Sequence, residues 1–378
     1  MYTRLLAPDK KNNVLLFGPR GTGKTTWVLN YYPEALKFDL LDSETYKEFL
    51  AKPNRLANYI PPGFKGQVII DEIQRVPELL NEVHRLIESL KITFILTGSS
   101  ARKLRRKGHN LLAGRALSYH MYPLTAIEMK EDFSVERALV RGTLPMAQQN
   151  NYEKYLQTYI QTYLEQEILQ EGLTRNLSAF SRFMEVASLS QGQVLNITNV
   201  AREAGIERSV VSGYFEILRD LLIGYFLPPF TKKAKRRLVS HPKFYYFDPG
   251  VYHAIRPKGP YDTPKEMSGI SLETLVHQQI NAVNELLDLG YKMHYFRTAS
   301  GIEVDFILYG KRGIKAVEVK ATDHFQDNML AGLKNFSRDY PEAKLYLLYG
   351  GTKKMYVDDI TILPIQEALL TLDKWLES

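Results

Sequence analysis

The sequence between residues 14 and 26 decides the fold, and it reads Val14-Leu15-Leu16-Phe17-Gly18-Pro19-Arg20-Gly21-Thr22-Gly23-Lys24-Thr25-Thr26. Its four apolar residues predict a buried strand, and the pattern G-x-x-x-x-G-K-T then leads into a segment that can form a helix. Glycines allow backbone N–H groups to point inward around a phosphate, and the helix presents its positive N-terminal end to the same anion. Gly18 to Thr26 are therefore predicted to bind a nucleoside triphosphate, with Lys24 on the β- and γ-phosphates and Thr25 on Mg²⁺.

A second acidic motif lies at a suitable distance along the chain. Residues 67–72 form a buried-strand pattern that ends in two carboxylates, Asp71 and Glu72. This pattern is typical of a Walker B motif, in which Asp71 holds Mg²⁺ through water and Glu72 polarises the attacking water. The alternative is a glycine-rich turn and an unrelated strand with an acidic end.

Composition restricts the class of protein. A chain of 378 residues is expected to form two or three domains, and 44% apolar with 24% charged residues is ordinary for a globular protein. The sequence has no apolar run of 18 residues and no signal-peptide pattern, so we expect no membrane partner and a cytoplasmic location. It also has no cysteine, which excludes disulfides, thiolate zinc sites and cysteine nucleophiles.

The net charge of +7 is concentrated in two short segments. Each holds five basic residues in six: Arg102, Lys103, Arg105, Arg106 and Lys107 in the first, and Lys232, Lys233, Lys235, Arg236 and Arg237 in the second. Without these ten the chain has 49 − 10 = 39 basic and 42 acidic residues. The clusters predict contacts to a polyanion, with DNA as the expected partner. Solvated loops are the alternative.

The first 125 residues alternate between strand and helix patterns. The expected strands are residues 14–17, 35–40, 68–70, 92–96 and 116–121. Strands joined by helices predict a parallel sheet covered on both faces, with ligands at the carboxyl ends of the strands.

Two further residues of this region are candidates for nucleotide chemistry. Ser99 follows the fourth expected strand and could sense the γ-phosphate or orient water, although a simple turn explains it as well. Arg115 is an isolated arginine placed to act as an arginine finger from a neighbouring subunit, which would require a homo-oligomer. A structural salt bridge is the competing interpretation of Arg115.

These segments together resemble an AAA+-type ATPase family of bacteria and archaea, in which the ATPase is fused to a C-terminal domain of restriction-endonuclease type. The resemblance covers nearly the whole chain and is carried by residues 18–25, 69–72, 96–100, 111–115, 122–125 and 138–145. It implies ATP and Mg²⁺ as ligands of the N-terminal domain.

The middle of the chain predicts a helical region and then a winged helix. Residues 152–170 carry tyrosines at helical spacing, a stripe that more often packs a helical subdomain than stacks bases. Residues 198–206 and 209–222 read as helix, glycine turn and helix. Residues 225–227 and 244–247 can form the strands of a wing, with the second basic cluster at its tip. A winged helix with a purely structural role is the alternative.

The last third contains a possible metal site. Glu273 lies on an expected helix, Asp305 on a strand over residues 301–308, and Glu318 with Lys320 on a strand over residues 315–320. Alternate side chains share one face of a strand, so a hairpin can bring Asp305 and Glu318 together as hard oxygen ligands of Mg²⁺, or of Mn²⁺. Lys320 would then orient a nucleophile or offset charge.

The spacing D-x₁₂-E-x-K resembles the PD-(D/E)xK nuclease superfamily. The resemblance implies a helix acid at Glu273 and a catalytic core of Asp305, Glu318 and Lys320, in a nuclease-like fold. A polar, exposed strand face is the alternative.

The predicted fold class is α/β with four parts. These are a P-loop parallel-sheet ATPase domain, a helical region, a winged helix and a restriction-endonuclease-like α/β domain, at residues 1–135, 136–190, 191–248 and 249–378. The leading functional hypothesis is a protein that binds and hydrolyses ATP and binds and processes DNA. The alternative is a nucleotide-switched regulatory or signalling ATPase whose nuclease-like domain binds a partner without cutting. A third possibility is nucleotide binding that serves structure only.

Overall fold

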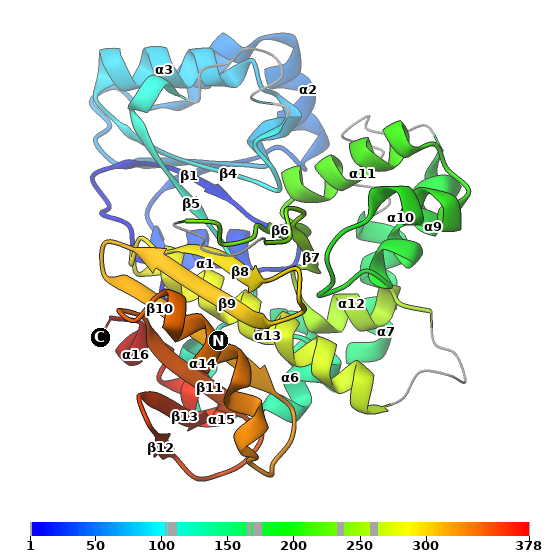
Figure 1. Cartoon of the computed structure of the whole chain (residues 1–378). Coiled ribbons are helices and arrows are strands. Elements are labelled where there is room, and N and C mark those ends of the chain that lie inside the picture. The colour runs from blue at the N-terminus through cyan, green and yellow to red at the C-terminus, as the bar shows by residue number, and fades with distance from the viewer. Residues whose placement is uncertain are drawn as a thin grey trace. The chain divides into compact units, whose positions relative to one another are not determined.

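A computed structural model gives the fold in two compact units (Figure 1). The N-terminal unit holds residues 3–123 and 220–222, and the C-terminal unit holds residues 124–219 and 223–377 together with residue 2. The structure describes residues 2–102, 104, 112–164, 168, 176–232, 238–257 and 264–377. The finer division into four domains stays a prediction.

A five-stranded parallel sheet forms the centre of the N-terminal unit. Its strands are β1 (Asn13–Phe17), β2 (Leu36–Asp39), β3 (Gln67–Asp71), β4 (Thr93–Gly98) and β5 (Ala116–His120). They are ordered β2-β3-β4-β1-β5, and each neighbouring pair is parallel. The prediction of a five-stranded parallel sheet is confirmed.

Helices and a continuous apolar core cover this sheet. The helical elements are α1 (Lys24–Tyr31), α2 (Ser43–Ala51), η1 (Pro53–Tyr59), η2 (Ile73–Arg75), α3 (Leu79–Leu90) and η3 (Leu112–Gly114). Residues 14–17 are all buried, so both faces of β1 are covered, as expected for a parallel strand. On α3 the buried residues Leu79, Val83 and Leu86 recur at helical spacing and pack against this core.

The C-terminal unit contains a six-stranded mixed sheet. Its strands are β8 (Lys292–Arg297), β9 (Glu303–Gly310), β10 (Gly313–Lys320), β11 (Lys344–Tyr349), β12 (Met355–Val357) and β13 (Ile360–Pro364). They are ordered β12-β13-β11-β10-β9-β8. β9 and β10 form the predicted hairpin, in which Phe306 pairs with Val317.

The unit also contains many helices. They include α5 (Ala126–Met129), η4 (Lys130–Asp132), α6 (Val135–Arg141), η5 (Pro145–Gln148), α7 (Tyr152–Thr158), η6 (Tyr159–Leu164), α9 (Leu177–Ser188), α12 (Pro249–Ile255), α13 (Pro264–Leu286), η7 (Asp327–Leu330), α14 (Ala331–Asp339), α15 (Ile365–Leu370) and α16 (Leu372–Glu377). Of these, α13, α14 and α15 contact the strands of this sheet. In the predicted tyrosine stripe, Tyr159 is fully buried and lies against Phe247, so this tyrosine serves packing.

The elements expected of a winged helix are present. α10 (Ile197–Ala204) ends at Gly205, whose φ of 65° is left-handed, and α11 (Arg208–Asp220) follows. β6 (Gly224–Leu227) and β7 (Lys243–Tyr246) then pair antiparallel. The second basic cluster lies in the connection between these two strands.

A buried carboxylate fastens α6 to α12. Asp248 caps α12 by accepting the Val251 N–H at 3.1 Å, and its other oxygen accepts the Thr143 N–H at 2.7 Å. Gly142 has a φ of 70°, and a Cβ there would lie 1.9 Å from the Asp248 carboxylate. Burial raises the pKa of Asp248 to about 6, although these N–H groups oppose the shift.

We expect Asp248→Asn to remove one component of the pH dependence of stability. The carboxyl has a pKa near 3.8 when unfolded and about 6 when folded, so between these values the folded state retains a proton that the unfolded state has lost. The stabilising contribution is therefore complete below pH 4 and is lost as the pH rises through 6, a change of about 3 kcal/mol. Urea unfolding at pH 4 to 7 should show the wild-type advantage over the variant shrinking across this window. The exposed Asp327→Asn serves as control, and parallel curves for wild type and Asp248→Asn would contradict the assignment.

Candidate functional site

The carboxyl ends of β1, β3 and β4 meet at one edge of the N-terminal sheet. β4 lies between the other two strands, so the loop after Phe17, the acidic pair after Ile70 and the turn after Gly98 are neighbours. Sequence patterns predicted each of these segments, and the strand order brings them together.

The loop after β1 has the backbone that a phosphate-binding turn requires. Gly21 and Gly23 have φ values of 80° and 90°, which favour glycine. A Cβ on Gly18 would come within 2.4 Å of the Met121 carbonyl oxygen, so this position also has no room for a side chain. Thr22 ties the loop to itself by donating its hydroxyl to the Pro19 carbonyl at 2.8 Å.

Arg4 is a further support of the loop, and sequence reasoning missed it. Its guanidinium donates to the Thr22 carbonyl at 2.8 Å and to the Tyr122 carbonyl at 2.6 Å. An arginine near the N-terminus belongs to no motif, so no local signal pointed to it.

Lys24 is buried although it is charged. Its Nζ donates to the carbonyls of Gly18 at 2.7 Å and Pro19 at 3.1 Å, which places the ammonium group within the turn of the loop. Of the other predicted binding residues, Arg20 is half-buried and Thr26 is exposed on the first turn of α1.

Asp71 is held by hydroxyls from two elements. Thr25 Oγ1, on α1, donates to one carboxylate oxygen at 2.8 Å, and Thr97 Oγ1, on β4, donates to the other. Hard oxygen atoms of Thr25 and Asp71 thus lie side by side, which is the donor chemistry that Mg²⁺ prefers. These residues fit a magnesium ion.

Glu72 is oriented by a neighbour that sequence reasoning did not single out. Glu72 has a left-handed backbone, with φ 60°, and its carboxylate accepts a hydrogen bond from the Gln74 side-chain amide. The same amide nitrogen lies 3.0 Å from the Ser99 hydroxyl oxygen. Gln74 therefore joins the residue predicted to polarise water to the predicted γ-phosphate sensor.

Arg115 lies at the opposite end of the sheet from the phosphate-binding loop. Asn13, the first residue of β1, pairs with Ala116, whereas Phe17 at the other end of β1 precedes the loop. At about 3.3 Å per residue these ends are roughly 13 Å apart. The Arg115 guanidinium forms an ion pair with Glu88. This contact matches the salt-bridge interpretation within one subunit, and a role in a neighbouring subunit stays a prediction.

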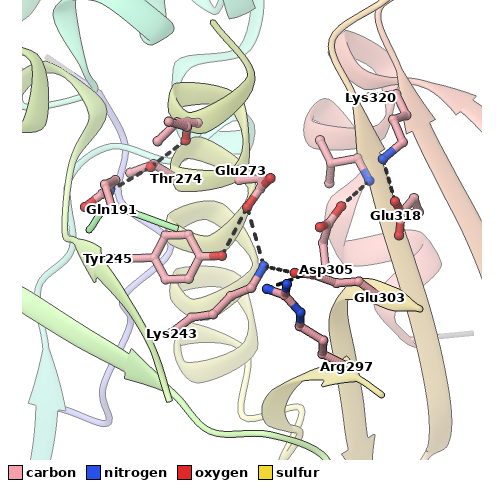
Figure 2. Close-up of polar contacts among 12 residues, drawn as sticks. Gln191, Lys243, Tyr245, Glu273, Thr274, Arg297, Glu303, Asp305, Glu318 and Lys320 are labelled. Atoms are coloured by element: carbon pink, nitrogen blue, oxygen red, sulfur yellow. Dashed lines mark hydrogen bonds and ion pairs between the residues drawn. The ribbon is translucent and has the colours of Figure 1, made fainter. Parts of the chain in front are cut away.

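The predicted residues of the C-terminal site lie in one region of the C-terminal unit (Figure 2). Extending the β9–β10 register by one residue places Asp305 opposite Glu318. Asp305 accepts the Val319 N–H at 2.8 Å, and Lys320 Nζ lies 2.6 Å from a Glu318 oxygen. The sequence prediction of a shared strand face is thus matched by the geometry.

Glu273 reaches the same region from α13. The Tyr245 hydroxyl donates to its carboxylate at 3.2 Å, and Lys243 Nζ lies 3.9 Å from the same oxygen (Figure 2). Lys243 Nζ also lies 2.5 Å from Glu303, which in turn contacts Arg297 at 3.5 Å.

Lys243 and Tyr245 are functional candidates that sequence reasoning missed. Both lie on β7, which we assigned to the wing of a winged helix, about 60 residues before Asp305. The available signal was their period-two spacing, which puts them on one face of a strand. Gln191 fixes this strand to α13, because its side chain donates to Thr274 and accepts the Tyr246 N–H, each at 2.8 Å.

Burial dominates the electrostatics of this site. It raises the pKa of Glu273, Asp305 and Glu318, and neighbouring carboxylates add to the shift of Glu273 and Glu318. His277, one turn after Glu273, stacks on Tyr245, and burial lowers its pKa to about 4. His277 is therefore neutral at pH 7.

A metal ion at Glu273, Asp305 and Glu318 stays a prediction. In the part of the chain that the structure describes, no three histidine or carboxylate side chains are grouped so that they could hold a metal.

Two residues of the basic clusters lie within the described part of the chain. Arg102 forms an ion pair with Asp220 at 2.8 Å, and Lys232 Nζ lies 4.2 Å from the centre of the Tyr309 ring. The other eight lie outside the described residues: Lys103, Arg105, Arg106, Lys107, Lys233, Lys235, Arg236 and Arg237.

None of the described helices combines the length and the apolar character needed to cross a bilayer.

Three sequence families match successive parts of the chain. Residues 10–130 match a family described as an AAA domain. Residues 132–262 match a domain of unknown function, DUF8612, and residues 268–368 match another, DUF4143. Neither of the latter two is described as a nuclease.

The relatives found by sequence are themselves uncharacterized. One, from Mycobacterium tuberculosis, is 26% identical over 377 residues, which are 95% of this chain and 81% of the relative. Another, from Haemophilus influenzae, is 23% identical over 329 residues, which are 80% of this chain and 77% of the relative.

Solved structures resemble the chain only remotely. The Orc1 protein of Aeropyrum pernix, solved in complex with DNA, is 14% identical and aligns over 65% of this chain and 86% of its own, with a TM-score of 0.24. A score this low carries no functional information. The five-stranded parallel sheet of the N-terminal unit is consistent with the AAA domain that residues 10–130 match.

We expect Thr97→Val to lower the affinity for the Mg²⁺ ion that binds with ATP, without changing the fold. Valine has the shape of threonine but cannot donate to Asp71, and one hydrogen bond to a charged group contributes about 1.5 kcal/mol, or roughly tenfold. Titrating Mg²⁺ at a fixed concentration of a fluorescent ATP analogue should show the half-saturating Mg²⁺ concentration rising by this factor. Thr93→Val, on the same strand but away from Asp71, is the matched control. An equal shift in both variants would contradict the role of Thr97.

Proposed function

We propose that the protein binds and hydrolyses ATP in its N-terminal unit and that this cycle governs the binding of DNA. The observation that carries the first part is the placement of Lys24, Thr25, Asp71 and Glu72 at one sheet edge, with Asp71 bonded to Thr25. Binding and hydrolysis of ATP need four side chains close together: a cation that binds the phosphates, two ligands of magnesium and a base.

Each residue has a definite task in this proposal. The N–H groups of the loop and the Lys24 ammonium bind the phosphates, while Thr25 and Asp71 hold Mg²⁺. The ion supplies neutralisation of the phosphate charge. Glu72 orients and polarises the attacking water, and Gln74 positions the Glu72 carboxylate relative to Ser99.

Two variants separate binding from hydrolysis. Lys24→Ala should lose ATP binding in calorimetric titration, because the loop loses its buried cation. Glu72→Gln should bind ATP as the wild type does but release phosphate about 10²- to 10³-fold more slowly, because the amide cannot act as a base. The exposed Glu44→Gln is the control and should match the wild type. Wild-type phosphate release no faster than that of Glu72→Gln would leave nucleotide binding with a structural role only.

The proposal of DNA as partner rests on charge and on the middle of the chain. The positive excess is confined to two six-residue segments, and one of them connects the strands of the β6–β7 hairpin. The hairpin follows a helix, glycine turn and helix, which are elements that place a wing beside a duplex. Basic side chains in such a connection suit phosphates rather than bases, so the expected binding is weakly dependent on sequence.

The salt dependence of DNA binding tests this partner. Neutralising four phosphate contacts by Lys233, Lys235, Arg236 and Arg237→Gln should reduce the slope of log affinity against log salt by up to about 3.6, at roughly 0.9 per contact. Fluorescence anisotropy with duplex and branched DNA, at increasing salt, measures this slope.

The matched control removes the same charge elsewhere, by replacing the exposed Lys47, Lys52, Lys353 and Lys354 with glutamine. If neutralising the basic residues of both clusters, at residues 103–107 and 233–237, leaves the slope as unchanged as in this control, the regulatory alternative is favoured, in which the C-terminal unit binds a partner other than DNA.

A further inference from the structure

Four carboxylates gather in the C-terminal unit, and a donor of the protein contacts each of them. This acidic cluster consists of Glu273, Glu303, Asp305 and Glu318. Glu273 accepts the Tyr245 hydroxyl, and Asp305 accepts the Val319 N–H. Glu318 and Glu303 contact Lys320 and Lys243, respectively (Figure 2).

Lys243 is the best-buried cation of this arrangement. Its side chain is only 3% exposed, and its Nζ lies between Glu303 at 2.5 Å and Glu273 at 3.9 Å. The ring of Tyr295, 5.5 Å from Nζ, adds a cation–π contact that helps to fix its position. Because β7 is paired along its whole length with β6, the backbone of Lys243 is also fixed.

The charges of the cluster nearly cancel without any metal. Four carboxylates face three cations, Lys243, Lys320 and Arg297, so full ionisation leaves a net charge of 3 − 4 = −1. A divalent cation needs several oxygen atoms at 2.0 to 2.6 Å. Here Lys243 and Lys320 occupy one oxygen atom each of Glu303 and Glu318, while the other Glu318 oxygen is buried without a hydrogen-bond partner among the described residues. Lys243 would repel an ion placed between Glu273 and Glu303.

We propose that the Lys243 ammonium group takes the place of a divalent cation in the acidic cluster, so that the cluster is closed to metal ions. The residues present therefore do not fit the metal that the nuclease resemblance implies. A phosphodiester has no neutralising metal ion in such a site. The C-terminal unit then does not cut DNA at this cluster and serves as a binding module. This inference does not depend on ATP hydrolysis, which other residues carry.

Manganese titration tests the proposal directly. Free Mn²⁺ is measured by electron paramagnetic resonance in the presence of nucleotide-free full-length protein. We compare wild type, Asp305→Asn, Lys243→Gln, Lys243→Met and the double variant Lys243→Gln/Asp305→Asn. Glutamine and methionine approximate the length of lysine without its charge. We expect the wild type to bind Mn²⁺ no more tightly than Asp305→Asn does, and Lys243→Gln to gain a site at least tenfold tighter, which the double variant loses.

Each outcome decides for or against the closed cluster. A wild-type Mn²⁺ site that Asp305→Asn removes would overturn the proposal, and so would folded Lys243 variants that gain no affinity. Circular dichroism establishes whether the variants fold. If neither single variant at position 243 folds, the comparison of wild type with Asp305→Asn decides alone, because equal weak binding supports the closed cluster and a lost site refutes it. ATP turnover with Mg²⁺, measured in parallel, reports separately on the N-terminal unit.

Discussion

The nucleotide-binding unit depends on one carboxylate, that of Asp71, and on the two hydroxyls that hold it. Thr25 belongs to the helix after the phosphate-binding loop, and Thr97 belongs to the strand between β1 and β3. Because these partners come from different elements, Asp71 keeps its orientation only while α1 stays in the same position relative to β4. The loop, the acidic pair and the Ser99 turn can cooperate only while this arrangement is kept.

The sequence predicted the N-terminal unit well because its signals are local. A glycine-rich turn needs particular backbone angles, and buried parallel strands need continuous apolar runs, so both are visible in short windows. The roles of Arg4, Gln74 and Thr97 were not predictable in this way. Each contacts a residue that is distant in the sequence and that comes close only because of the order of the strands. Short sequence patterns do not reveal such contacts.

The C-terminal unit shows the same division between local pattern and long-range packing. The hairpin, and with it the pairing of Asp305 and Glu318, followed from period-two alternation and a glycine turn. Lys243 was missed because it comes from a strand that pairs in another sheet, with its own partner β6. The sequence pattern therefore indicated the acids but not the buried Lys243 ammonium group that contacts Glu273 and Glu303, and this cation changes the chemistry that we propose for the site.

The position of Arg115 has a consequence for quaternary structure. Arg115 lies at the end of the sheet where β1 begins, whereas the phosphate-binding loop lies at the end where β1 stops. If this arginine acts in a neighbouring subunit, each subunit contacts that neighbour through the Arg115 end of its sheet. Its own phosphate-binding loop, at the other end of the sheet, then receives the arginine of a third subunit. Such contacts are heterologous, so they close into a ring or continue as a filament rather than forming a twofold pair.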